Sequence, residues 1–212
     1  MIEVRGVSVR FGEVPALTSV TLDLKSGEVL GLLGHSGSGK TTLLRVIVGL
    51  QAPDSGTVTI DDMVVNDPAI VVQPHLRGVS MVFQSPGLWP HMTVAENIRF
   101  TLEGMPNVEQ DARILGLLKA AGMEGYGGRH PGQLSGGEAR RVSILRALAP
   151  RKHYVLMDEP LVNLDPEIKS ELHGLIRSEA AGRGVLYVTH DGSELEGFAD
   201  RVLRLRRGTI EG

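Results

Sequence analysis

The stretch GHSGSGKTT, from Gly34 to Thr42, constrains this chain more than any other part of it. From Gly34 to Thr41 it fits the pattern G-x-x-x-x-G-K-[ST] of a phosphate-binding loop. The apolar run 28–33 before it predicts a buried strand, and the apolar residues 43–48 after it predict a helix that ends at Gly49. Strand, loop and helix in this order indicate a polyphosphate site. The alternative is an ordinary turn rich in glycine and serine.

The glycine, lysine and threonine residues of this loop each suit the binding of a polyphosphate. Glycine lets the backbone bend tightly with its N–H groups turned toward a polyphosphate, and the helix that follows adds the positive end of its dipole. We expect Lys40 to reach the β- and γ-phosphates and the Thr41 hydroxyl to bind Mg²⁺. The predicted nucleotide-binding residues of the loop are Gly34, His35, Ser36, Gly37, Ser38, Gly39, Lys40, Thr41 and Thr42.

Composition excludes several other classes of protein. With 42% hydrophobic and 22% charged residues, the 212-residue chain suits one medium domain with room for a smaller lobe. The net charge of -3 gives no electrostatic reason to expect a nucleic-acid partner, and the absence of cysteine excludes disulfides and thiolate metal sites. The N-terminus lacks the apolar core of a signal peptide, and no apolar run approaches the ~18 residues of a membrane helix. We therefore expect a cytoplasmic protein.

Apolar patterning predicts a mixed α/β fold. Strands are expected at 2–11, 20–24, 28–33, 56–60, 79–83, 154–157, 184–189 and 202–205, with 61–78 as a connection. No helix is predicted between the strands at 2–11, 20–24 and 28–33, which indicates an antiparallel sheet added to the parallel one.

Helix starts are predicted by capping residues. Thr93 with Glu96, and Ser135 with Glu138, form capping-box patterns, and Asp165 precedes a proline in the first helical position. Helical spacing around 114–121 and a short helix at about 193–199 complete the prediction. Because 93–149 is mostly helical, we expect a helical lobe inserted between strands.

Polar residues follow four of the predicted strands: the phosphate loop, Gln84, Asp158 with Glu159, and Thr189 with His190. In a parallel sheet, ligands bind at the carboxyl ends of strands. Asp158 could hold a Mg²⁺ that bridges phosphates, Glu159 could deprotonate an attacking water, and His190 could contact charge developing on the γ-phosphate. Each also has a simpler interpretation, as a turn cap, a solvated turn residue or a satisfied polar side chain.

With LSGGE at 134–138, the order of motifs over essentially the whole chain resembles the ATP-binding cassette family. The phosphate loop matches Walker A, 154–159 matches Walker B and 161–165 matches the Asp-loop. Gln84 matches the Q-loop, His190 the switch histidine, and Phe11 the aromatic residue that stacks on adenine.

The resemblance implies one cassette domain over 1–212, an α/β P-loop NTPase. Its RecA-like core of mostly parallel sheet and an antiparallel β-subdomain would comprise 1–84 and 150–212, and its helical subdomain about 85–149. The family's head-to-tail dimers bury two ATP, each between Walker A of one subunit and the signature of the other. The implied trans contacts are Ser135, Gly136, Gly137 and Glu138, the Mg²⁺ contacts are Thr41, Gln84 and Asp158, and the catalytic residues are Glu159 as general base, His190 as γ-phosphate sensor and Gln84.

The loop 87–98 resembles the segment of importer-type cassettes that contacts membrane-spanning partners, although Trp89 could instead pack on its own lobe. The implied function is ATP hydrolysis that powers solute transport across a membrane, most consistent with an importer. The implied partners are transmembrane permease subunits and a second ATPase subunit in an ATP-dependent homodimer, with no nucleic acid. The implied location is the inner face of the cell membrane, reached through those subunits.

Three positions depart from the family pattern: Phe11 replaces Tyr, Glu138 replaces Gln in the signature, and Val162 replaces Ser in the Asp-loop. The chain ends soon after its last strand, so we expect no C-terminal regulatory domain. Two other classes compete. Cassette ATPases that work on DNA or ribosomes carry long coiled-coil insertions or a second cassette, for which there is no room, and the net charge does not suit them. The residues Lys40, Asp158, Glu159 and His190 argue against a non-hydrolysing scaffold, and an ATPase assay decides that question.

Overall fold

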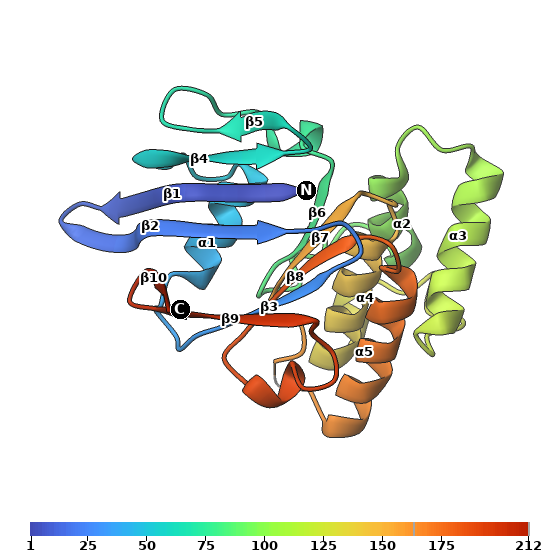
Figure 1. Ribbon diagram of the computed structural model, residues 1–212. Coiled ribbons are helices and arrows are strands. Elements are labelled where there is room, and N and C mark those ends of the chain that lie inside the picture. The colour runs from blue at the N-terminus through green and yellow to red at the C-terminus, as the bar shows by residue number, and fades with distance from the viewer. Residues whose placement is uncertain (163, 212) are drawn as a thin grey trace. The chain divides into compact units, whose positions relative to one another are not determined.

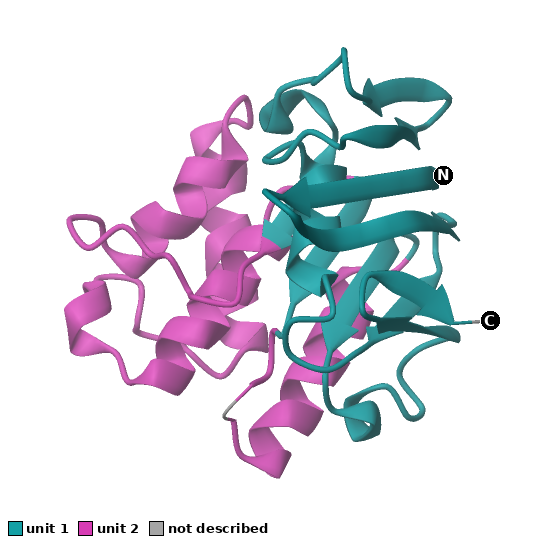
Figure 2. Cartoon of the chain, turned by 90° about the vertical axis from the view of Figure 1, so that its left-hand side faces the viewer, with its two compact units in different colours: residues 1–81, 153–159, 182–212 teal, residues 82–152, 160–181 magenta. Residues whose placement is uncertain are grey.

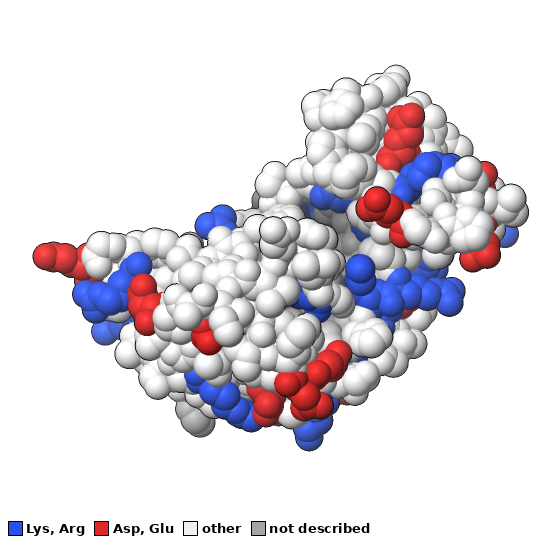
Figure 3. All heavy atoms as spheres, turned by 90° about the horizontal axis from the view of Figure 1, so that it is seen from above, with Lys and Arg blue, Asp and Glu red and all other residues white. Residues whose placement is uncertain are grey.

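A computed structural model describes residues 1–162 and 164–211, which form two compact units (Figure 2). Unit 1 comprises 1–81, 153–159 and 182–212, and unit 2 comprises 82–152 and 160–181. In the described residues no helix is both long and apolar enough to cross a membrane. On the face seen in Figure 3, acidic and basic side chains are interspersed, so this face carries no extended surface of one sign.

Unit 1 contains an antiparallel sheet in the order β2-β1-β4-β5 (Figure 1). Its strands are β1 (Ile2–Phe11), β2 (Val14–Leu24), β4 (Ser55–Ile60) and β5 (Met63–Asn66). The sequence did not predict β5. Asp61 and Asp62 both have positive φ, which is the backbone of a two-residue hairpin turn, but Asp-Asp is a weaker turn signal than Asn-Gly.

The second sheet has the strand order β10-β9-β3-β8-β7-β6. Its strands are β3 (Val29–Leu33), β6 (Val79–Val82), β7 (Tyr154–Asp158), β8 (Gly184–Thr189), β9 (Arg201–Arg206) and β10 (Thr209–Glu211). β3 is parallel to both β8 and β9, and β7 is parallel to β8. The predicted fold class, a mostly parallel sheet with an added antiparallel one, is confirmed. β10 was not predicted, because three residues are too few for a periodic signal.

Helix α1 (Lys40–Val48) follows the phosphate loop, and its apolar residues join a core cluster with side chains of both sheets. Gly49 ends the helix in the left-handed conformation. The buried Arg77 donates to the carbonyl oxygens of Val46 and Ile47, at 3.2 and 2.8 Å. These bonds supply donors to carbonyls in the last turn of the helix, where Val46 also accepts from the Gly49 N–H and the Asn66 amide, at 3.2 and 2.7 Å.

Unit 2 is helical, with α2 (Val94–Arg99), α3 (Asn107–Ala120), α4 (Gly136–Leu148) and α5 (Pro166–Glu179). Both predicted capping boxes are present, at Thr93 and Ser135. Asp165 precedes α5 as predicted, but its side chain makes no capping hydrogen bond within the described residues. The predicted helix at 193–199, in unit 1, is wrong: only a 3₁₀ turn, Gly192–Glu194, forms there.

Candidate functional site

The phosphate loop leaves the end of β3 and returns as α1. The Gly34 N–H donates to the Thr189 carbonyl at the end of the neighbouring β8, at 3.2 Å. Gly39 has φ 106°, and a Cβ there would lie 2.5 Å from the Ala16 carbonyl oxygen. Both the conformation and the space therefore require glycine.

The start of α1 offers free backbone donors. In the described part of the chain, the N–H groups of Gly39, Lys40 and Thr41 make no hydrogen bond, and the buried Ser38 hydroxyl also has no partner. Unpaired N–H groups at a helix N-terminus form an anion site. The loop can therefore offer backbone donors to a phosphate group.

Lys40 supplies a positive charge at this loop. Its side chain is only 5% exposed, and Nζ donates to the carbonyl oxygens of Gly34 at 2.5 Å and His35 at 2.9 Å. Nζ also lies 3.6 Å from the Glu159 Oε1 atom. The ammonium group is thus held within the loop that would surround a phosphate.

Thr41 and Asp158 form a pair that suits a magnesium ion. The Thr41 hydroxyl donates to Asp158 Oδ2 at 2.8 Å, although the two residues are 117 positions apart in the chain. Burial is the largest cause of a raised pKa at Asp158, which the Thr41 hydrogen bond opposes. Mg²⁺ usually takes one or two protein oxygen ligands together with phosphate oxygens, and this hydroxyl and carboxylate fit that requirement.

Glu159 follows β7 directly and adopts φ 46°, a left-handed backbone that is uncommon for a residue with a side chain. Its N–H donates to the Val188 carbonyl at 2.9 Å, which ties it to β8. Its Oε2 atom lies 3.1 Å from His190 Nδ1. The ends of β3, β7 and β8 therefore bring Lys40, Glu159 and His190 together, as the strand-end argument predicts.

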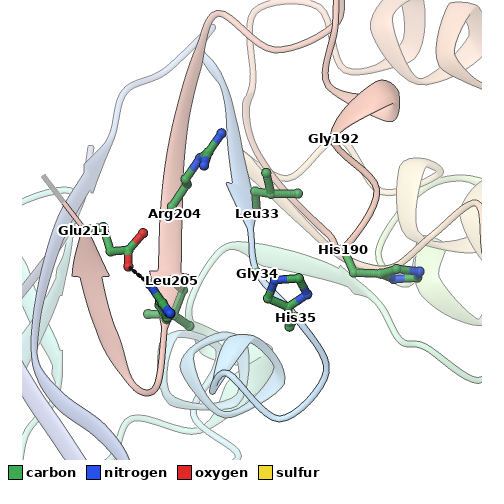
Figure 4. A pocket seen from close by; sticks show the side chains of 9 residues that line it. Leu33, Gly34, His35, His190, Gly192, Arg204, Leu205 and Glu211 are labelled. Atoms are coloured by element: carbon green, nitrogen blue, oxygen red, sulfur yellow. Dashed lines mark hydrogen bonds and ion pairs between the residues drawn. The ribbon is translucent and has the colours of Figure 1, made fainter.

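A cavity of about 400 Å³ opens beside this cluster (Figure 4). His35 and His190 line it from the ends of β3 and β8, and Arg204 from β9. The ion pair between Arg206 and Glu211, at 3.4 Å, lies along the same wall. The sequence argument did not include β9 or β10 in the site.

Phe11 is the last residue of β1 and 53% exposed. It pairs with Val14 at the start of β2, and the same strand carries the Ala16 carbonyl that lies against Gly39. The ring of Phe11 is thus an accessible flat face in the unit that holds the phosphate loop. This is what stacking on a base requires.

The LSGGE motif begins α4 in unit 2. Ser135 accepts from the Glu138 N–H at 3.2 Å, and Glu138 accepts from the Ser135 N–H and the Tyr126 hydroxyl, both at 2.7 Å. These hydrogen bonds, with the one from the Ser135 N–H first, lower the pKa of Glu138. Arg129 lies over the Tyr126 ring at 3.8 Å. Glu138, which stands where the family usually has Gln, therefore has hydrogen-bond partners within its own unit. Sequence reasoning did not identify one of them, Tyr126.

Gln84 is exposed and lies two residues beyond β6, in unit 2. Arg140 of α4 donates to the carbonyl oxygens of Phe83, at 2.8 Å, and of Gln84. The backbone at Gln84 is therefore attached to the helix that begins with the signature. Sequence reasoning missed Arg140, because an arginine in an amphipathic helix is normally solvated.

Trp89 packs on its own unit. Its ring centroid lies 4.5 Å from that of Phe100 and 4.9 Å from the guanidinium of Arg146. Arg146 also donates to the carbonyl oxygens of Pro86 and Gly87. The simpler interpretation of Trp89 thus holds for part of the ring, and contact with a membrane partner stays a prediction. Asn163, in the predicted Asp-loop, lies outside the described residues.

Comparisons with known proteins agree with this geometry. A family model described as ABC transporter matches residues 17–162. The chain is 43% identical to the sulfate/thiosulfate import ATP-binding protein of Caulobacter vibrioides over 99% of its own length and 63% of the relative. It is 41% identical to the spermidine/putrescine import ATP-binding protein of Pseudomonas aeruginosa over 100% of its length and 58% of the relative. It thus spans about three fifths of these curated relatives.

Two solved structures superpose on the whole chain. A dimeric ATP-binding cassette in a post-hydrolysis state, bound to ADP and phosphate, gives a TM-score of 0.89 at 33% identity and is covered over 97% of its length. The ATP-binding subunit of an ABC transporter gives 0.90 at 26% identity and is covered over 88%. Together with the matched family model, these similarities show that the chain belongs to the ABC transporter family.

Proposed function

We propose that this chain binds and hydrolyses ATP as the nucleotide-binding subunit of a membrane transporter of the import type. The observation that carries the proposal is the cluster at the phosphate loop, where Lys40, Glu159 and His190 are in contact beside the Thr41–Asp158 pair. The relatives named as import ATP-binding proteins support the direction of transport.

Phosphate binding would use loop groups that are hydrogen-bonded to each other in this structure. Lys40 would turn from the carbonyl oxygens of Gly34 and His35 to the β- and γ-phosphates, and residues 34–42 would supply their backbone N–H groups. Thr41 and Asp158 would hold Mg²⁺, with Gln84 as a further oxygen ligand. When bound, this ion neutralises charge on the phosphate oxygens. Phe11 would stack on the adenine.

Hydrolysis would depend on Glu159. Its carboxylate follows the proposed Mg²⁺ ligand by one residue and can accept a proton from the water that attacks the γ-phosphate. His190 lies 3.1 Å from that carboxylate, so one imidazole can orient the base and contact the γ-phosphate. These two residues, with Gln84, form the proposed catalytic set.

We infer that the chain works as an ATP-dependent homodimer. Ser135, Gly136, Gly137 and Glu138 would contact the γ-phosphate bound to the second copy, because the N–H groups of Gly136 and Gly137 make no hydrogen bond to any described residue and a helix start suits an anion. The dimeric cassette with bound ADP and phosphate supports this arrangement. In this proposal 1–84 and 150–212 form the core with its β-subdomain, and about 85–149 forms the helical subdomain.

The partners proposed outside the dimer are transmembrane permease subunits, contacted through the loop 87–98. They would hold the chain at the inner face of the cell membrane. The relatives' names as import subunits support this placement.

The test measures phosphate release by the purified chain with and without Mg²⁺. We expect Mg²⁺-dependent hydrolysis that Lys40→Ala abolishes. Co-expression with the permease genes that neighbour this gene should then yield a complex with faster hydrolysis. ATP binding without any hydrolysis, alone or in that complex, would contradict the proposal and favour a scaffold.

A further inference from the structure

A buried carboxylate, Glu194, lies behind the end of β8 in unit 1. Its residue is 5% exposed, and it belongs to the 3₁₀ turn Gly192–Glu194 that follows His190. The Oε2 atom accepts from the Tyr187 hydroxyl at 3.1 Å and from the Thr189 hydroxyl at 2.9 Å. The steps proposed for hydrolysis leave this group without a role.

The hydrogen bonds around Thr189 have one direction. The backbone N–H of Asp191 can only donate to the Thr189 hydroxyl oxygen, so the hydroxyl proton of Thr189 is left to be donated to Glu194 Oε2. The Thr189 hydroxyl oxygen lies 3.0 Å from the Asp191 nitrogen. The bonds therefore run from Asp191 through Thr189 to Glu194, and they enclose the backbone of His190 on both sides.

The same segment is fixed at two further points. The Thr189 carbonyl accepts from the Gly34 N–H of the phosphate loop, at 3.2 Å. Asp191 Oδ1 accepts from the N–H and the hydroxyl of Ser193, at 3.0 and 2.6 Å, which closes the turn. The His190 side chain, in contrast, is 52% exposed. Its direction is thus determined by its backbone more than by packing.

We propose that Glu194 is a positioning residue for His190, acting through the Thr189 hydroxyl and the Asp191 N–H to hold the imidazole against Glu159. The inference rests on the proposed role of His190 at the γ-phosphate. The inference predicts that loss of the hydrogen bonds between Asp191, Thr189 and Glu194 slows hydrolysis and leaves ATP binding intact, because Lys40 and the loop amides do not take part in these bonds. Tyr187, the other donor to Glu194, is not a member of the hydrogen-bonded series from Asp191 through Thr189 to Glu194.

The decisive comparison is Thr189→Val against Tyr187→Phe. Both variants keep nearly the same shape and remove one hydroxyl that donates to Glu194, but only Thr189 also accepts from Asp191. Misplacing a reacting group by about 1 Å can cost ~100-fold in rate. We expect Thr189→Val to lower kcat by about 10- to 100-fold with the KM for ATP within about twofold, and Tyr187→Phe to leave both near wild type.

Variants at Glu194 itself test the acceptor. Glu194→Gln keeps an oxygen that can accept both hydroxyls, so its kcat should stay within about threefold of wild type, whereas Glu194→Leu should behave like Thr189→Val. Thr189→Ser should restore the rate. If Glu194→Leu does not fold, the Thr189 pair still decides the question, because it leaves the buried carboxylate in place with Tyr187.

A double-mutant cycle identifies the target. With His190→Ala as the background, adding Thr189→Val should change the single-turnover rate by less than about twofold, because residues that act in series are not additive. A further tenfold loss of the single-turnover rate in the double variant would overturn the inference about Glu194, and so would equal kcat values for Thr189→Val and Tyr187→Phe. Neither result would contradict the proposed function. His190→Ala with the wild-type rate would overturn the proposed role of His190 as well.

Discussion

The substitution Glu159→Gln tests the proposed mechanism most directly. Gln has nearly the same shape as Glu and keeps an oxygen that can face His190, now 3.1 Å away, but it cannot take a proton from water. General-base catalysis contributes ~10²–10⁴-fold. At 1.36 kcal/mol per tenfold change, this is about 2.7–5.4 kcal/mol of barrier. We expect kcat to fall by that factor while ATP affinity persists.

The fold should tolerate this change. Gln loses the charge that faces Lys40 at 3.6 Å, but it also removes the repulsion through which Glu159 adds to the raised pKa of Asp158, for which burial is the first cause. The two effects oppose each other, so we expect a Tm within about 2–4 °C of wild type, which corresponds to ~1 kcal/mol for a chain of this size. A larger shift would mean that lost activity reflects unfolding.

The assay combines phosphate release, calorimetric ATP binding and size-exclusion chromatography with Mg-ATP. Because opening of the dimer would follow hydrolysis, Glu159→Gln should accumulate as an ATP-bound dimer, and Ser135→Arg on the same chain should abolish that dimer. Thr93→Arg is the matched control, because it removes the N-cap side chain of α2 from a capping box like that of Ser135. Each substitution should lower the free energy of unfolding by about 1 kcal/mol, but Thr93 lies outside the proposed trans site.

Hydrolysis at the wild-type rate by Glu159→Gln would remove this residue from the mechanism. A dimer that survives Ser135→Arg, or that Thr93→Arg abolishes equally, would remove the head-to-tail arrangement.

Three further substitutions test separate parts of the proposal. Lys40→Ala should abolish ATPase activity and severely weaken nucleotide binding, because Lys40 is the only cation among residues 34–42; an unchanged calorimetric affinity would contradict the phosphate site. Phe11→Ala should raise the Kd for ATP about tenfold or more, since base stacking is worth ~1–3 kcal/mol, whereas Phe11→Tyr should bind normally; normal binding by Phe11→Ala would leave Phe11 as an ordinary strand residue. Trp89→Ala should leave basal hydrolysis of the isolated chain nearly intact and impair its stimulation by permease subunits. Loss of the folded chain would show instead that the packing of Trp89 on Phe100 and Arg146 is its main role.

Features that depend on neighbours along the chain were predictable from the sequence. The capping boxes at Thr93 and Ser135 join residues three positions apart, and both are present. The alternation of β1, the buried runs of β7 and β8 and the glycines of the phosphate loop likewise follow from local rules of backbone and burial. Where the local signal was weak, the prediction failed, as at β5, β10 and residues 193–199.

The contacts that make the site depend on which strands become neighbours. The order β3-β8-β7 brings the Thr41 hydroxyl to Asp158 across 117 residues, and it sets the separation of His190 from Glu159. Arg140 of α4 likewise reaches the backbone at Gln84 across 56 residues, through packing within unit 2. The sequence by itself determined which residues could carry phosphate chemistry. Only the tertiary structure decided their partners, because packing of distant segments, and not spacing along the chain, brings those atoms within hydrogen-bonding distance.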